Sequence, residues 1–196
     1  APNRVVEKVP DVLTSTVVPE LLDTLVQTFT DLEEPRDRRL QVKGVLHMLG
    51  DKGMRAFLEV SQHQNRSIRR TALDALREIG EAAEPSILDL LAAEGLEAQL
   101  ACDFIDVLGD VGTDRSAKAA DALLEHKEPK VRAASIALYS KLAKSGAQER
   151  LLKMLDDDAN LVLAAVVDAL GKERDKSDDL TQLYKKVLNP LVCGKY

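Results

Sequence analysis

The sequence is poor in aromatic residues and in residues that ligate metals or form disulfides. It has no tryptophan, its aromatic residues make up 3% of 196 residues, and it contains two cysteines and three histidines. Cys102 stands among apolar residues and Cys193 stands in the C-terminal tail, so we expect no disulfide. No His or Cys stands at metal-site spacing from another. The sequence therefore predicts neither a metal nor another cofactor.

Long apolar runs and a surplus of basic residues are also missing. No apolar run approaches the roughly 18 residues that span a bilayer, so we expect no membrane insertion. The chain has 33 acidic and 27 basic residues, with both signs interleaved and a formal net charge of −6. Binding to nucleic-acid phosphates needs a basic stripe, so we expect no nucleic-acid partner. Nothing in the use of cysteine requires an oxidising compartment, and we expect a cytoplasmic protein.

Sequence motifs of catalysis are missing as well. The chain has no nucleophile elbow, no phosphate-binding loop and no dinucleotide-binding fingerprint. Paired acids such as Glu33 with Glu34 and Asp178 with Asp179 fall in predicted turns and helix starts. Carboxylates at such positions cap helices and are hydrated. The sequence therefore predicts a protein that is not an enzyme.

What the sequence does contain is an internal repeat. Five stretches end alike at steps of 28 to 34 residues, with Leu49-Gly50, Ile79-Gly80, Leu108-Gly109, Leu142-Ala143 and Leu170-Gly171. Counting back 0, 3, 4 and 7 residues from the last apolar residue of each stretch gives twenty positions, of which only Ser135 is not apolar. These offsets share one face of a helix, so each stretch predicts an amphipathic helix, named helix A. The Gly that follows four of them suits a left-handed helix end.

A second amphipathic helix, named helix B, is predicted after each helix A, at about residues 53–62, 85–93, 114–126, 146–156 and 177–188. Pro85 in a first turn, and Thr113 before Asp114, are typical of helix starts. Residues 19–30 have apolar residues at helical spacing, and we interpret them as a lone helix B that caps the first repeat. Such hairpins bury their apolar faces only by stacking on their neighbours.

The repeat predicts a simple domain organisation. We expect a lead-in over residues 1–18, loosely ordered or a short helix, one repeat domain over residues 19–190, and a tail over residues 191–196. Leu191 and Val192 in the tail either fold back over the last helix or mark a cut inside a longer protein.

The helix-A pattern resembles that of the HEAT family, in particular the short bacterial HEAT-like repeats of about 30 residues. The resemblance is carried by residues 67–80 and 129–138, where a Val-Arg or Ile-Arg pair precedes an Ala-rich helix, and it extends over about residues 36–190. It implies a right-handed α-α superhelix of about five helical hairpins plus the N-terminal capping helix. An Arg stands ten positions before the end of three A helices, and we interpret it as a capping residue that contacts nearby carbonyl or acidic groups, at Arg39, Arg69 and Arg132.

The resemblance also implies that the B helices line the inner surface. The candidate contacts for a partner are then the polar residues of these helices: Arg55, Glu59, Gln62, Asp89, Lys118, Asp121, Arg150, Lys153, Gln182 and Lys185. The turns around residues 62–65 and 125–130 are a second candidate region, because loops often carry function.

A repeat of this kind presents long surfaces, so binding is the expected role. We expect a non-catalytic scaffold or adaptor for another protein or peptide, as part of a larger protein. One alternative is an accessory enzyme resembling a phycobilin lyase, because those proteins share the short repeats. Another alternative is a segment that regulates a neighbouring catalytic domain in the same chain.

Overall fold

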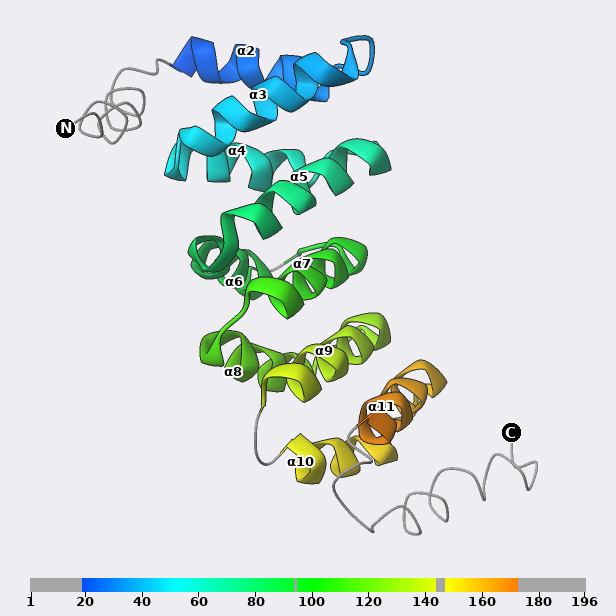
Figure 1. Ribbon diagram of the computed structural model, residues 1–196. Helices are drawn as coiled ribbons and strands as arrows, with labels where there is room; N and C mark the ends of the chain where they lie inside the picture. The colour runs from blue at the N-terminus through cyan, green and yellow to red at the C-terminus, as the bar shows by residue number, and fades with distance from the viewer. Residues whose placement is uncertain (1–18, 94, 144–146, 173–196) are drawn as a thin grey trace, which may run out of the picture. The chain divides into compact units, whose positions relative to one another are not determined.

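The computed structural model describes residues 19–93, 95–143 and 147–172 (Figure 1). Within these ranges every regular element is helical and there is no strand, which confirms the predicted all-α fold. The chain forms two compact units, one ending at Ala83 and one beginning at Glu84. The expectation of one repeat domain over residues 19–190 stays a prediction. The predicted lead-in, the tail and the predicted helix at residues 177–188 lie outside the described residues. The described helices are too short or too polar to cross a bilayer.

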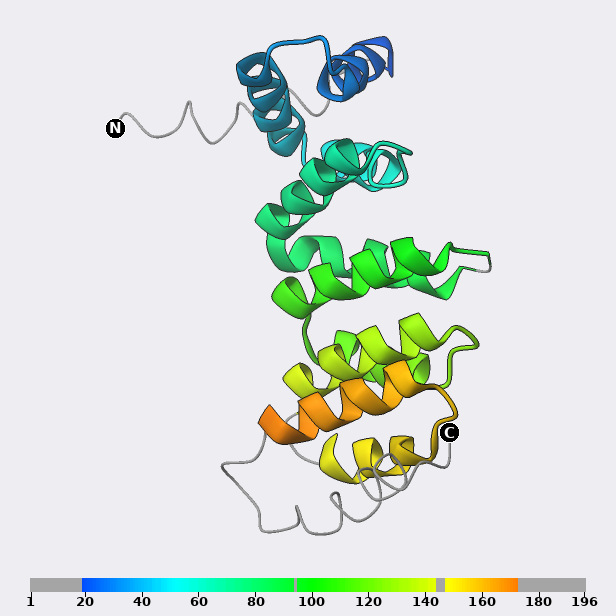
Figure 2. The same ribbon diagram turned by 90° about the vertical axis from the view of Figure 1, so that its right-hand side faces the viewer.

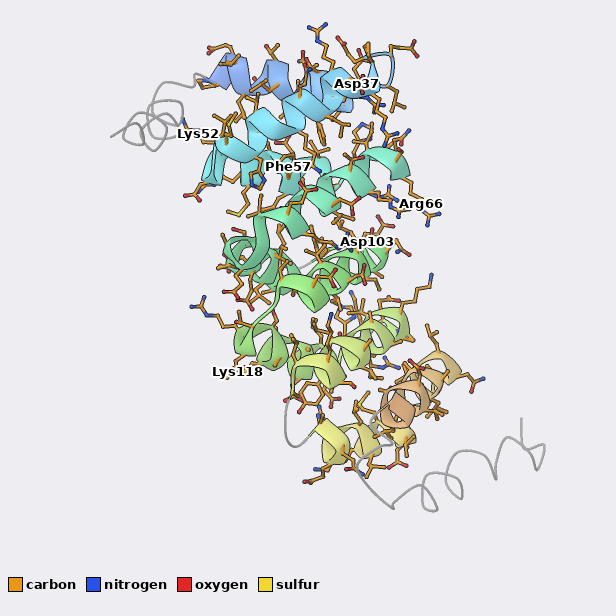
Figure 3. All side chains as sticks on the ribbon, in the orientation of Figure 1. Asp37, Lys52, Phe57, Arg66, Asp103 and Lys118 are labelled. Carbon is orange, nitrogen blue, oxygen red and sulfur yellow. The ribbon has the colours of Figure 1, made fainter. Side chains whose placement is uncertain are left out.

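The first unit consists of α2 (Pro19–Thr30), α3 (Arg36–Met48), α4 (Asp51–Val60) and α5 (Arg66–Ile79), followed by the 3-10 turn η1 (Gly80–Ala83). The bounds of α2 are those that the sequence predicts. Its Phe29 packs edge-on against Phe57 of α4 (Phe57 is labelled in Figure 3), with ring centroids 5.7 Å apart. Phe57 is fully buried. This contact holds the two B helices of the first unit together.

The second unit consists of α6 (Glu84–Ala92), α7 (Ala98–Val111), α8 (Asp114–Leu123), α9 (Pro129–Leu142), α10 (Ala147–Lys153), the 3-10 turn η2 (Met154–Asp156) and α11 (Asn160–Lys172). The A helices α7, α9 and α11 lie side by side, and the B helices lie along their other side (Figures 1 and 2). The core between α9, α10 and α11 is built from aliphatic side chains, including Ile136, Leu151 and Val166.

The repeat columns identify the core correctly. Each of the twenty side chains in these columns is buried or half-buried, and none is exposed. The prediction that a Gly ends four A helices is only half right. Gly50 and Gly80 end helices with φ of +55° and +75°, a region that favours glycine. Gly109 and Gly171 lie inside α7 and α11, which continue past them, because a helix interior tolerates glycine at modest cost.

Candidate partner-binding site

The B helices of the first unit enclose a groove, here called the α2–α4 groove. It has a volume of about 440 Å³ and is lined by Pro19, Leu22, Asp23, Val26 and Gln27 of α2 and by Lys52, Arg55, Ala56 and Glu59 of α4. On α2 the half-buried Leu22 and Val26 are four residues apart and so share one side of the helix. On α4 the buried Ala56 is small, which leaves room between the helices. The result is an apolar floor beneath a charged rim.

The rim of the α2–α4 groove carries charges of both signs. Asp23 stands on the α2 side, while Arg55 and Glu59 stand four residues apart on the α4 side, and all three are exposed. None of them forms an ion pair with another residue in the described part of the chain. Exposed charged groups without an ion-pair partner, beside an apolar floor, are typical of surfaces that bind amphipathic segments.

A second hollow, of about 430 Å³, lies in the second unit between the end of α8, α10 and the turn after η2. Its charged side chains are already paired. Arg150 donates from Nε to Asp121 at 2.8 Å and from Nη2 to Glu125 at 2.7 Å, so α10 is tied to α8. These two carboxylates raise the pKa of Arg150. A ligand here has to compete with existing ion pairs.

Arg132 forms the most extensive polar contact of this hollow. Its Nε and Nη2 donate to the two oxygens of Asp157 at 2.7 and 2.8 Å, and its Nη1 donates to the carbonyls of His126 and Lys127 at 2.9 and 3.2 Å. Burial raises the pKa of Asp157, but the hydrogen bonds from Arg132 and from the amide of Ala159 outweigh it and hold that pKa below its ordinary value. The paired guanidinium and carboxylate fasten the turn before α9 to the turn before α11.

The predicted capping role of the repeated Arg is confirmed at two of its three positions. Arg69 donates from Nη1 to the carbonyls of His63 and Gln64, both at 2.9 Å, as Arg132 does in its own turn. At Arg39 the Nε atom is enclosed and has no hydrogen-bond partner among the described residues. The turn before α3 therefore departs from the other two.

Two histidines, for which the sequence predicted no metal-ligand role, belong to the same turn motif. His63 Nδ1 accepts the backbone N–H of Asn65 at 3.0 Å, and His126 Nδ1 accepts that of Glu128 at 3.0 Å. In both turns the His carbonyl also accepts the Arg six residues later. The spacing of His63 to Arg69 and of His126 to Arg132 was the available signal in the sequence. The side chains of His63 and His126 are therefore hydrogen-bonded within their own turns, whose conformation they stabilise.

Glu84 is a buried acid, with 3% of its surface exposed. Its carboxylate accepts hydrogen bonds from the backbone amides of Thr113 and Ser116 and from both of their hydroxyl groups. Burial raises the pKa of Glu84, but these hydrogen bonds, led by that of the Ser116 hydroxyl, bring it below its ordinary value. An acid beside two hydroxyl groups resembles a catalytic arrangement, but here both hydroxyl groups and both amides donate to the carboxylate. The Glu84 carboxylate therefore caps the start of α8.

The predicted contact residues fall into separate groups. Arg55 and Glu59 line the α2–α4 groove, while Arg150 and Lys153 line the second hollow and Asp121 pairs with Arg150. The others in the described chain are not part of either hollow: Gln62, Asp89 and Lys118 (the last labelled in Figure 3). Gln182 and Lys185 lie outside the described residues. The α2 wall, with Leu22, Asp23 and Val26, was missed because α2 was interpreted only as a cap.

Comparisons with known proteins find one similar solved structure, at low sequence identity. No protein-family model matches this chain, and no curated protein matches it. Among solved structures, the chain is similar to one in the complex of CpcE and CpcF of the phycocyanin lyase from Nostoc sp. PCC7120. The identity is 18%, the TM-score is 0.41, and the match covers 87% of this chain and 72% of that one. At this identity the similarity says nothing of ligand, activity or partner.

Proposed function

We propose that this protein is a non-catalytic adaptor built from HEAT-like repeats, and that the α2–α4 groove binds a segment of another protein. The proposal rests on the contrast between the two hollows. In the second unit the charged groups Arg132 and Arg150 are already satisfied by acids of the same chain. In the α2–α4 groove the rim charges Arg55 and Glu59 are exposed and form no ion pair with other described residues.

The shape of the groove indicates the kind of segment. Its apolar residues Leu22 and Val26 follow one side of α2, so the groove runs along the helices and accepts a row of apolar side chains. Its volume of about 440 Å³ has room for a few such side chains. A helical or extended segment with apolar anchors, flanked by one acid for Arg55 and one base for Glu59, satisfies both the floor and the rim.

The ionisable groups of the second unit support a non-catalytic role. Glu84 and Arg132 are each saturated with hydrogen bonds that hold helices and turns. Burial, together with the charge of Asp103, raises the pKa of the Cys102 thiol, which disfavours the reactive thiolate. General acid–base and nucleophilic catalysis need groups that are poised to exchange protons, and these groups are not.

The test is site-specific photo-cross-linking in a lysate of the source organism. The probe p-benzoylphenylalanine is placed at Arg55 in the groove and, as a matched control, at the exposed Arg70 on α5 of the same unit. We expect a defined protein to be captured at Arg55 and not at Arg70, and a Val26→Asp substitution to abolish its capture. The same proteins captured at both positions would exclude the groove as the binding site. A visible absorbance band in the purified protein would support a chromophore-handling enzyme instead.

A further inference from the structure

Two connections between a helix B and the next helix A share one hydrogen-bond motif. In the first, His63 Nδ1 accepts the backbone N–H of Asn65 at 3.0 Å, and the His63 carbonyl accepts Arg69 Nη1 at 2.9 Å. The connection after α8 repeats both contacts, at the same distances, at His126. The two segments, residues 63–69 and 126–132, are here called the His–Arg turns. Each ties an imidazole to the start of a helix A.

The motif requires a neutral imidazole. An acceptor at Nδ1 places the ring hydrogen of the neutral histidine on Nε2, whereas an imidazolium has a hydrogen on both nitrogens and only donates. Histidine gains this second hydrogen between about pH 8 and about pH 5. His63 is exposed, so water can deliver the proton. Once His63 is protonated, its Nδ1–H faces the N–H of Asn65, and that amide has lost its acceptor.

Protonation of His63 also adds a positive charge beside Arg69. The Arg69 guanidinium donates to the His63 and Gln64 carbonyls at 2.9 Å, so it lies next to the residue that becomes charged. Arg66, the first residue of α5 and labelled in Figure 3, adds a further positive charge, and Glu59 is the one acid in the last turn of α4. Like charges repel, so this effect and the lost hydrogen bond weaken the same turn.

The turn before α3 lacks both parts of the motif. Glu33 stands six residues before Arg39, where the other two turns have a His. Two residues after Glu33 stands Pro35, which has no N–H to donate. The guanidinium of Arg39 forms no hydrogen bond with the described residues, and its Nε is enclosed. The Arg is thus held by its turn where the His motif is present and is not held where the motif is missing.

We propose that the His–Arg turns are acid-sensitive latches. When His63 or His126 takes up a proton, the amide hydrogen bond to its ring breaks and the Arg is released from the His carbonyl. The connection between the helix B and the next helix A then loosens. This inference concerns the turns alone and does not depend on what binds in the α2–α4 groove.

The two latches respond unequally, because their surroundings differ in charge. Around His126 the charged side chains of the packed elements are Arg132 of α9, Arg150 of α10, Glu125 after α8, and Asp157 and Asp158 before α11. Asp157 binds Arg132 at 2.7 and 2.8 Å, so this Arg stays attached when its carbonyl contact is lost. Arg69 has no acid among its hydrogen-bond partners. The turn at His63 therefore opens further than the turn at His126.

Nuclear magnetic resonance of the full-length chain tests the neutral state of the latches. Long-range hydrogen–nitrogen spectra distinguish the two tautomers of a neutral histidine. We expect His63 and His126 to carry their ring hydrogen on Nε2 at about pH 7.5. The control is His47, which is exposed on α3 and forms no hydrogen bond with the described residues through its ring. A ring hydrogen on Nδ1 of His63 would overturn the proposal.

Amide hydrogen exchange, compared with a matched variant at each pH, tests the opening. His63→Asn keeps an acceptor for the Asn65 amide, because an Asn oxygen accepts the N–H two residues on, but it does not titrate. Between about pH 7.5 and about pH 5.5 we expect the Asn65 amide of the unchanged chain to lose about fivefold in protection relative to the variant. The Glu128 amide should lose less. Protection of the Asn65 amide that changes equally in both chains would overturn the proposal.

Discussion

The Ser116 hydroxyl, in the first turn of α8, donates a hydrogen bond of 2.6 Å to the carboxylate of Glu84, the first residue of α6. The same carboxylate accepts the backbone amides of Thr113 and Ser116 at 2.8 and 3.1 Å. These are amides that the start of a helix leaves without partners. The hydroxyl oxygen of Thr113 itself accepts only one of these amides, the backbone N–H of Arg115, at 3.3 Å. The start of α8 is thus stabilised by a side chain from another helix, which links two successive B helices.

Removing this cap should destabilise the second unit. The change Glu84→Ala leaves two amides and two hydroxyl groups without their acceptor in a buried place, at a cost of about 2–3 kcal/mol. The free energy of unfolding from urea titration, and hydrogen exchange of the Thr113 and Ser116 amides, measure the effect. The control is Glu97→Ala, because the exposed Glu97 precedes α7 and its side chain forms no capping bond. An equal loss in both variants would contradict the capping role.

The acid side of the stability curve should depend on Glu84 and Asp157. Both have pKa values below the ordinary ones in the folded state, so the unfolded chain takes up protons first as the pH falls. Their stabilisation is complete above the ordinary carboxyl pKa of about 4 and is lost as the pH falls through the lower, folded values. We expect the Asp157→Asn variant to be less stable at neutral pH and to lose less stability on acidification. Parallel pH profiles for both proteins would contradict this assignment.

Gly53 permits the close approach of α3 and α4. It is buried, and a Cβ atom there would overlap the carbonyl group of Leu46. Because backbone cannot move aside as a flexible side chain does, Gly53→Ala should cost about 1–3 kcal/mol. Gly109→Ala is the control, since a Cβ atom there meets nothing within 4 Å and alanine favours the helix by up to about 1 kcal/mol. Thermal unfolding followed by circular dichroism should separate the two variants in opposite directions.

The apolar columns predict the helices and their core from the sequence because burial in a helix repeats every three to four residues. The ends of helices are less predictable. α7 passes Gly109 and stops before Gly112, where a Cβ atom would overlap the carbonyl oxygen of Leu108 and approach Ser116 Oγ at 2.6 Å. The sequence pattern does not distinguish these two glycines, since the crowding at the second depends on how the chain leaves α7 and where α8 begins.

The grooves depend on contacts between repeats, which a single sequence does not contain. The apolar residues Leu22 and Val26 predict a helix, but not that one side of it stays open toward α4. In the same way, Arg132 was predicted to cap, whereas its partner Asp157 lies 25 residues later, at a distance set by the stacking of α9 and α11. The sequence thus identifies the residues that form helices, and packing decides which of them remain available to a partner.

The two Arg turns should respond unequally to Arg→Lys substitution. Arg132 binds two carbonyls and, through two nitrogens, Asp157, whereas Arg69 has the two carbonyls alone among its hydrogen bonds. Lysine cannot reproduce the two-pronged contact, so Arg132→Lys should cost about 2 kcal/mol and Arg69→Lys about 1 kcal/mol or less. Urea titration of both variants measures this difference. Equal losses would show that the contact with Asp157 adds nothing.

Ser135, the single polar residue in the repeat columns, should be replaceable by alanine. It is fully buried in α9, and its hydroxyl donates at 2.8 Å to the Val131 carbonyl one turn earlier. That carbonyl is also positioned for the ordinary helical hydrogen bond, so Ser135→Ala leaves no group unsatisfied and should change stability by less than about 0.5 kcal/mol. Ser116→Ala is the matched comparison, because that equally buried hydroxyl binds the charged Glu84 and its loss should cost about 1–2 kcal/mol. A large loss in Ser135→Ala would mean that the column tolerates only a hydroxyl group there, and that the exception is a requirement of packing between repeats.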